Sequence, residues 1–515
     1  MGKREKGFAL MTVLIFFLVL LILGVGGAII TQMGFFSITS EVKYARAEKN
    51  ANIGLMTVLE SGDCNDTSGG NTFEGYTVKT SNDTEYNYCF VWSEGRYWGA
   101  KVVKTSIFPL KRWAAVIFRK LDELKEERNT AIVGYDPEGN NSCSDTSSCT
   151  GHALLVGNPI YPKEKKGKRG KHTTWYTQIA CYDDLKNQGG LISTINPFVY
   201  DEDLQNLDLT PWLFKVEDIK TENGSKLFEK LSQSFQVSFN NDGTPMGLVY
   251  PEINLSVNSC IAEGITITCG ERGNADIFTW NSEKGVYRYN KDGKDYSKID
   301  FGNAQITFNS FSGGGYIAGK NINFNKDANV NPDSPLVLVA RERITLSKND
   351  NNINISNTFM FSQGYEIYSN FSIIKNGIIC SGGAKGKLDI NIKGGHNTQL
   401  GTYSEPILII SNNIEGINIE GAGHVDIWGV IFVTDTNNKF SLEEKGGFSI
   451  HGVIINNSNS PSSQNTINLK SNSDIRFNFK VLENLYKNLS QFNLLRSPIC
   501  YNKKNLFILT TMRTY

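Results

Sequence analysis

Residues 8–40 read FALMTVLIFFLVLLILGVGGAIITQMGFFSITS and contain no charged side chain. Residues 8–30 are almost purely aliphatic and aromatic. At 1.5 Å per residue they would form a helix about 34 Å long, enough for a hydrocarbon core of roughly 30 Å. Lipid offers the backbone no hydrogen-bond partners, so only a helix can satisfy such a segment internally. The sequence therefore predicts a single membrane-spanning helix near the N-terminus.

The leader MGKREKG before this helix is short and basic, because Lys3, Arg4 and Lys6 outweigh Glu5. Such a charge bias predicts a cytoplasmic N-terminus in the inner membrane, with the rest of the chain facing outward. The alternative is a secretory signal peptide, whose apolar core is shorter and is followed by a small-residue cleavage site. Here the apolar run is too long and no A-x-A site directly follows it.

The helix is expected to continue to about residue 60, because no proline interrupts residues 8–60. Charged residues begin at Glu41, but apolar residues continue among them. The two halves would make one rod about 80 Å long. The apolar positions of the polar half are Val42, Ala45, Ala51, Ile53, Leu55, Met56, Val58 and Leu59.

The basic leader, the Gly7-Phe8 junction, the uncharged helix and the Ala-rich continuation YARAEKNA (residues 44–51) together resemble a type IV prepilin, in the style of the PilX-type minor pilins. The resemblance implies that a prepilin peptidase cuts between Gly7 and Phe8 and that Phe8 is then N-methylated. It also implies that the helix leaves the inner membrane to pack against other pilins in a pilus. The alternative is a plain N-terminal anchor that is never processed.

Thr12 departs from the family pattern, in which the fifth mature residue is a glutamate that neutralises the N-terminal amine of a neighbouring subunit. An uncompensated amine inside an apolar bundle is costly. A subunit with Thr12 therefore suits the filament tip, where it has no earlier subunit to pair with, as the tip pseudopilins of type II secretion do. The alternative is a divergent branch in which this residue varies.

The composition favours an extracytoplasmic head with disulfides. The chain has 515 residues, zero formal net charge and nine cysteines. Cysteines after a membrane span suggest an oxidising compartment. No C-x-x-C occurs and only five histidines are present, so neither a zinc site nor a cofactor is expected. The candidate disulfide residues are Cys64, Cys89, Cys143, Cys149, Cys260 and Cys269. Three further cysteines are Cys181, Cys380 and Cys500, and the odd total leaves at least one thiol free or intermolecular.

Residues 61–271 are expected to form a mixed α+β head region. After a loop at 61–70, a strand is predicted at 73–80, followed by an aromatic hairpin that turns at Ser93–Arg96. Residues 112–128 show helical spacing and predict a second helix. LFEKLSQSF (227–235) predicts another helix, and QVSFN and ITITC predict strands. The basic run at 163–171 could hold DNA phosphates, but it is short and contains no aromatic residue, so a solvated loop is favoured and no nucleic-acid partner is expected.

From residue 272 to 480, short apolar runs recur every 20 to 30 residues, separated by Asn, Gly and Asp. This self-similarity predicts a parallel β-solenoid with Asn ladders at its corners, and an antiparallel β-sandwich is the alternative. A strand is expected at 475–479 and a helix at 480–491. Residues 481–515 are expected to cap the solenoid. FKVLENLYKNL and the preceding GFSIHGVIINN also resemble the close of PilX-type heads. The predicted fold class is thus α+β. The repeated runs begin at residues 317, 338, 360, 379, 409 and 431.

A catalytic role must be weighed for the repeated region, because parallel β-helices often carry polysaccharide-cleaving enzymes. The carboxylates Asp389, Glu415, Glu420 and Asp426 are scattered and match no catalytic motif. His424 beside Asp426 would face the same side of a strand and predicts a surface hydrogen bond. The loops at 290–295 and 325–329 could attract Ca²⁺ but lack the closing glutamate of a calcium loop. No enzyme is expected; a membrane-tethered polysaccharide enzyme is the alternative.

The head is large for a pilin. About 455 residues would have a radius of gyration of roughly 22 Å, too wide to repeat on every closely spaced helix of a shaft. The sequence therefore predicts a minor pilin at the tip or in priming, whose head faces a host cell, a surface polymer or another tip protein.

Overall fold

The computed structural model divides the chain into two compact units. Unit 1 comprises Met1–Leu110 and Lys503–Tyr515, and unit 2 comprises Lys111–Asn502. These boundaries differ from the predicted ones at residues 271 and 480. The structure describes residues 3–61, 70–83, 88–109, 113–126, 131–134, 152–158, 198–200, 202–216, 225–271, 273–325, 327–346, 352–367, 371–382, 387–393, 397–411, 416–420, 424–434, 441–443, 447–458, 465–469, 473–498 and 507–514.

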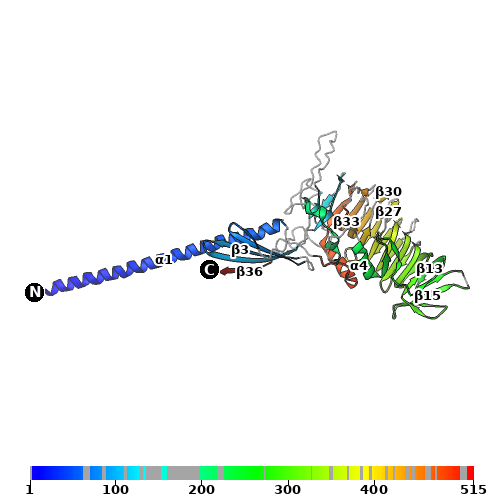
Figure 1. Cartoon of the computed structure of the whole chain (residues 1–515), viewed down its shortest axis with the longest axis horizontal. Helices are drawn as coiled ribbons and strands as arrows, with labels where there is room; N and C mark the ends of the chain where they lie inside the picture. The colour runs from blue at the N-terminus through cyan, green and yellow to red at the C-terminus, as the bar shows by residue number, and fades with distance from the viewer. Residues whose placement is uncertain are drawn as a thin grey trace, which may run out of the picture. The chain divides into compact units, whose positions relative to one another are not determined.

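Unit 1 combines one long helix with an antiparallel sheet. The predicted single rod is confirmed as α1 (Lys3–Ser61). Its second half packs along β3 and β4 (Figure 1). The sheet order is β1-β2-β3-β4-β36. Its strands are β1 (Asn71–Phe73), β2 (Tyr76–Asp83), β3 (Tyr88–Tyr97), β4 (Ala100–Pro109) and β36 (Phe507–Thr514).

The hairpin turn predicted at Ser93–Arg96 is wrong. Ser93–Arg96 lies inside β3, and the chain reverses at Trp98-Gly99, whose φ angles are 46° and 84°. Two residues with positive φ form the type I′ connection that suits a twisted hairpin. Gly95 serves another purpose, because a Cβ there would lie 2.0 Å from the Ala47 carbonyl oxygen of α1. The strand predicted at 73–80 is likewise broken, by a turn at residues 74–75.

Unit 2 is inserted between two neighbouring strands of unit 1. β4 pairs antiparallel with β36, with Ile107 opposite Phe507. The chain thus leaves the sheet at the end of β4 and returns to the same place as β36. The predicted cap at 481–515 is therefore split, because its last strand belongs to the sheet of unit 1.

Unit 2 is built from parallel strands stacked in register. Gly315 pairs with Leu336, Leu336 with Thr358, and Gly377 with Ile407, so partners are 20 to 30 residues apart, as predicted. A β-sandwich would pair such strands antiparallel. Figure 1 shows the strands following one another in chain order. The central strands are β18 (Lys298–Asp300), β19 (Gln305–Phe311), β20 (Gly315–Phe324), β21 (Asn329–Val330), β22 (Leu336–Leu346), β23 (Asn352–Ser356), β24 (Thr358–Ile367), β25 (Phe371–Lys375), β26 (Gly377–Ser381), β27 (Lys387–Lys393), β28 (Asn397–Leu400), β29 (Ile407–Ser411), β30 (Gly416–Glu420), β31 (His424–Val433), β32 (Ser441–Glu443), β33 (Gly447–Asn456), β34 (Thr466–Leu469) and β35 (Asp474–Phe477).

Apolar side chains fill the stack and also cover one outer face of it. Strands such as Leu336–Ala340 are buried throughout their length, as expected where both faces of a parallel sheet are covered. The predicted helix at 227–235 is confirmed as α4 (Ser225–Phe235), and its Phe235 packs 5.1 Å from Phe359 of β24, between ring centroids. Asn ladders also occur, since the Asn354 amide donates to Asn329 Oδ1 at 3.2 Å.

The helix predicted at 112–128 is wrong. Residues 114–118 form the fully buried strand β5 (Ala114–Phe118), which pairs in parallel with β33 on one side and β8 on the other. Periodicity cannot tell whether a five-residue apolar run is a helix or a strand. Burial of both faces is typical of a strand in a parallel sheet. The stack therefore continues past β33 into the first strands of unit 2, which are β5, β6 (Glu123–Glu126), β7 (Ala131–Val133), β8 (His152–Val156) and β9 (Phe198–Tyr200).

The remaining elements lie beside or beyond the stack. The predicted C-terminal helix is confirmed as α5 (Phe479–Leu489), and it packs beside β31 and β33. An antiparallel series of strands, β13 to β17, extends from β13, which also pairs with β19. The other bounds are η1 (Glu202–Asn206), α3 (Thr210–Leu213), β10 (Val237–Phe239), β11 (Pro245–Leu248), β12 (Ile253–Asn254), β13 (Ser259–Gly264), β14 (Thr266–Cys269), β15 (Asp276–Asn281), β16 (Val286–Tyr289), β17 (Asp295–Tyr296) and η2 (Ser490–Phe492).

Candidate assembly helix and its attachment to the sheet

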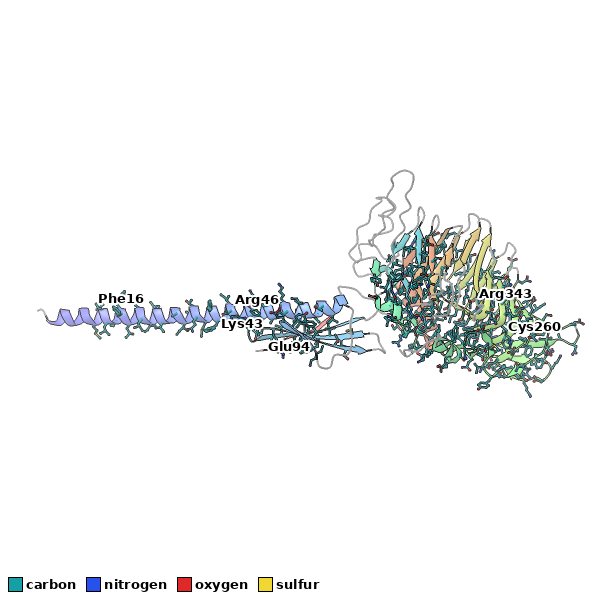
Figure 2. The ribbon with its side chains drawn as sticks, turned by 45° about the horizontal axis from the view of Figure 1, so that its top comes forward. Phe16, Lys43, Arg46, Glu94, Cys260 and Arg343 are labelled. Atoms are coloured by element: carbon teal, nitrogen blue, oxygen red, sulfur yellow. A yellow bond between two sulfur atoms is a disulfide. The ribbon has the colours of Figure 1, made fainter. Side chains whose placement is uncertain are left out.

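The first half of α1 exposes its apolar side chains. Residues Met11–Leu55 are long and apolar enough to include a membrane span, with a mean hydropathy of 3.1 over the most apolar window and none of that window buried. Phe16 is 64% exposed, and Figure 2 shows it projecting from the helix with no other element beside it. Exposed apolar area on this scale marks a surface that a membrane or another protein covers.

The exposed apolar surface continues beyond the reach of one bilayer. Phe35, Phe36 and Ile38 are each more than 60% exposed. Residues 8–40 span about 50 Å of helix, whereas a hydrocarbon core is roughly 30 Å thick. If residues 8–30 occupy the core, these three side chains lie outside it. A bilayer alone therefore leaves part of the surface uncovered, and a second apolar helix could cover it.

The residues that the sequence singled out for processing lie on this helix. Gly7 and Phe8 are part of the continuous backbone of α1, and Thr12 is exposed on it. Cleavage, methylation and the tip role of Thr12 remain predictions.

The second half of α1 is fixed to the sheet through small residues. Ala47 and Ala51 are fully buried against Val102 and Ala100 of β4. Gly54 is equally confined, because a Cβ there would meet Ser93 Oγ at 2.2 Å. Small side chains on both surfaces let the helix and sheet backbones approach closely, so the apolar half projects from a firmly held base.

Ion pairs and hydrogen bonds surround this attachment, and those of Arg46 and Lys104 join α1 to the sheet. Glu94 of β3 is 2% exposed and pairs with Lys101 at 2.6 Å and with Arg96 (Figure 2 labels Glu94). Burial alone would raise the pKa of Glu94, but hydrogen bonds from Lys101 and Arg96 outweigh it and lower the pKa below 4.5. Arg46 of α1 donates to the Tyr97 hydroxyl at 2.6 Å. Lys104 of β4 reaches Glu48 of α1 at 2.8 Å.

Acid should weaken unit 1 through Glu94. Because the pKa is lowered on folding, the ionised group stabilises the fold above its unfolded pKa, and this contribution is lost as the pH falls through the folded value, below 4.5. We expect Glu94→Gln to lower the free energy of unfolding by about 2 kcal/mol at neutral pH. The measurement is urea unfolding of the wild-type protein and of Glu94→Gln between pH 3 and 7. If the free energy of unfolding of the variant fell with acid as much as that of the wild type, Glu94 would not be the source of the acid sensitivity.

In the described part of unit 2, His424, Asp426 and Ser449 meet but do not have the geometry of a catalytic relay. His424 Nε2 lies 3.0 Å from Asp426 Oδ1, as predicted, and 3.2 Å from Ser449 Oγ. The hydrogen bond with Asp426 raises the pKa of His424. Both partners meet the same ring nitrogen, whereas a Ser-His-Asp relay uses both nitrogens. Asp389 lies on a different ladder, with its backbone in register with Glu366 and Gly416.

The loops considered for Ca²⁺ have other partners. Asp292, in the turn between β16 and β17, accepts from the Lys294 backbone N–H at 2.9 Å and from the Tyr296 hydroxyl. Asp327 accepts from the Asn352 backbone N–H at 3.3 Å. Within the described ranges, no three His, Cys, Asp or Glu side chains are grouped to hold a metal ion. The basic run at 163–171 and the carboxylate Glu415 lie outside the described residues.

The cysteines fall into three groups. Cys260 and Cys269 form a disulfide between β13 and β14, with a Cα–Cα distance of 4.1 Å. Cys89 is also disulfide-bonded. Cys380 of β26 is a buried free thiol, and burial raises its pKa. Five cysteines lie outside the described residues, namely Cys64, Cys143, Cys149, Cys181 and Cys500.

The sequence reading missed the group formed by Lys104, Glu48 and Asn52. Glu48 and Asn52 are four residues apart and therefore share a helix face. Nothing in the sequence marks Lys104 as their partner, because that contact depends on the register of β4 against α1.

Comparison with known proteins reveals little sequence similarity. No protein-family model and no curated protein matches the sequence. Among solved structures, the chain is similar to the competence-associated pilin ComZ from Thermus thermophilus, at 11% identity. The match covers 92% of this chain and 98% of that one, with a TM-score of 0.21.

Proposed function

We propose that the protein is a minor subunit of a type IV pilus or a related filament. Its α1 would anchor it in the inner membrane with the N-terminus cytoplasmic. A prepilin peptidase would cut between Gly7 and Phe8, and the helix would then pack among the helices of other pilins. The role proposed is structural rather than enzymatic.

The observation that carries this proposal is the length of the exposed apolar surface on α1. A plain anchor needs to cover only the hydrocarbon core, but the uncharged run extends about 20 Å further. Phe35, Phe36 and Ile38 are exposed in that extension. A bundle of similar helices would cover the whole run, because each neighbour offers an apolar surface of the same length.

Unit 2 favours a position at the tip or in priming. We interpret its parallel, in-register stack as a β-solenoid, which presents long rows of side chains to a partner. A second unit of this size on each closely spaced shaft subunit would crowd, whereas one copy at the end would not. Thr12 supports the same position, since a tip subunit has no earlier N-terminal amine to neutralise. The solenoid would then contact a host cell, a surface polymer or another tip protein.

The direct test is the mature N-terminus. Mass spectrometry of the protein from sheared surface filaments should find N-methylated Phe8 as the first residue. The same measurement on a Gly7→Leu variant, in which the cut is blocked, should find the leader intact and the protein confined to membranes. An unprocessed wild-type chain that never co-sediments with sheared filaments would reduce the protein to a membrane-anchored ectodomain.

A further inference from the structure

Lys104 is a buried lysine held against two side chains of α1. Its side chain is 7% exposed, which is rare for lysine. Its Nζ lies 2.8 Å from Glu48 Oε1 and 2.9 Å from Asn52 Oδ1. An amine, a carboxylate and a carboxamide therefore meet at one point between β4 and α1.

We propose that Lys104 and Asn52 join in an intramolecular isopeptide bond, with Glu48 transferring the protons. The Lys104 ammonium gives a proton to the Glu48 carboxylate, and the neutral Nζ attacks Cγ of Asn52. The Glu48 carboxylic acid then returns the proton to Nδ2 of Asn52, the Cγ–Nδ2 bond breaks, and ammonia leaves and takes up the remaining proton. The net reaction converts an ammonium and a primary amide into a secondary amide and an ammonium ion. No oxidant or cofactor is required.

The arrangement supplies what this reaction needs. The nucleophile is hydrogen-bonded to the oxygen of the group it attacks, so the two are held at close range on two packed elements. The base contacts the same nitrogen, within the reach that proton transfer requires. The buried Ala47 and Ala51, and the close approach at Gly95, hold α1 and the sheet in this register.

A second lysine–amide contact provides an internal control. In unit 2, Lys215 Nζ donates to Asn493 Oδ1 at 2.6 Å, and this contact is exposed. Lys215 has no ion pair with a carboxylate among the described residues. The proposed mechanism therefore predicts a bond at Lys104 and none at Lys215.

The bond would cross-link α1 directly to β4, the strand from which the large insertion leaves the sheet. Unit 2 enters and leaves unit 1 through β4 and β36, so any pull on unit 2 reaches β4. A link from Lys104 to Asn52 would carry that pull into α1 without relying on hydrogen bonds. The inference is independent of leader cleavage, so it stands or falls separately from the filament role.

The test is peptide mapping of the full-length chain, extracted from membranes and reduced. Trypsin does not cut after an acylated lysine, so residues 102–111 should appear as one peptide, joined to residues 50–79. The joined species should weigh one ammonia less than the sum of the two. Lys215 should be cleaved normally.

The decisive variant is Glu48→Gln, which keeps both reactants and the shape of the side chain. We expect it to lose the joined peptide and to be cut after Lys104, as should Asn52→Ala. Wild-type protein that is fully cut after Lys104, with no loss of ammonia, would overturn the proposal. Equal bond formation in Glu48→Gln would overturn the role of Glu48.

Discussion

Replacing Gly452 by valine is expected to lower the free energy of unfolding of unit 2 by about 4 kcal/mol or more, which is among the largest effects of a single substitution. Gly452 of β33 stacks on Gly429 of β31, and a Cβ at 452 would lie 1.8 Å from the Gly429 carbonyl oxygen. This carbonyl group belongs to the backbone of a paired strand, so it cannot move aside as a flexible side chain would. Urea unfolding followed by circular dichroism measures the loss.

The matched control is Gly270→Ala. Gly270 also has a positive φ, of 86°, but a Cβ there meets nothing within 4 Å. Its replacement should cost about 1 kcal/mol, the conformational penalty alone. Equal losses at the two positions would show that close packing of the strands at Gly452 is not the cause.

A charge placed on α1 beyond the bilayer should separate an anchor from an assembly helix. Phe36→Asp leaves residues 8–30 unchanged, so insertion in the membrane should be normal. In a filament the charge would be buried among apolar helices, at a cost of about 3 kcal/mol, which is roughly a hundredfold in the incorporated fraction. Quantifying the protein in sheared filaments and in membranes measures both effects.

Phe36→Leu is the control for this substitution, because it keeps an apolar side chain at the same depth and should incorporate normally. Unimpaired incorporation of Phe36→Asp would mean that residue 36 does not lie inside a helix bundle. Loss of the protein from the membrane fraction itself would mean that the span is not residues 8–30.

The part of the fold that the sequence predicted well is the part set by local patterns. No proline interrupts residues 8–60, and α1 ends at Ser61, within one residue of its expected end at 60. The recurrence of short apolar runs roughly every 20 to 30 residues predicted the parallel pairing of unit 2, because each turn of such a stack buries the same kind of strand.

Errors arose where one pattern has two physical meanings. The buried run AAVIF of β5 is compatible with a helix or a strand. It forms a strand because β33 and β8 pair with it on either side. A glycine in an aromatic hairpin suggests a turn, but Gly95 is required where the sheet meets α1. The pairing of β4 with β36, and the meeting of Lys104 with Asn52, depend on three-dimensional register that no local pattern encodes.

The order of the ladder constrains how the chain can reach its native state. Arg119, just after β5, donates to the carbonyl oxygen of Asn457, and the two are separated by 338 residues. β5 can pair early with β8, but its other neighbour, β33, becomes available only when the last turns of the stack have been synthesised. Contacts of such long range make folding slow, so most of unit 2 must be synthesised before β5 is enclosed. Until then the unpaired edge of β5 is open to aggregation, and factors that keep it apart from other chains would raise the yield.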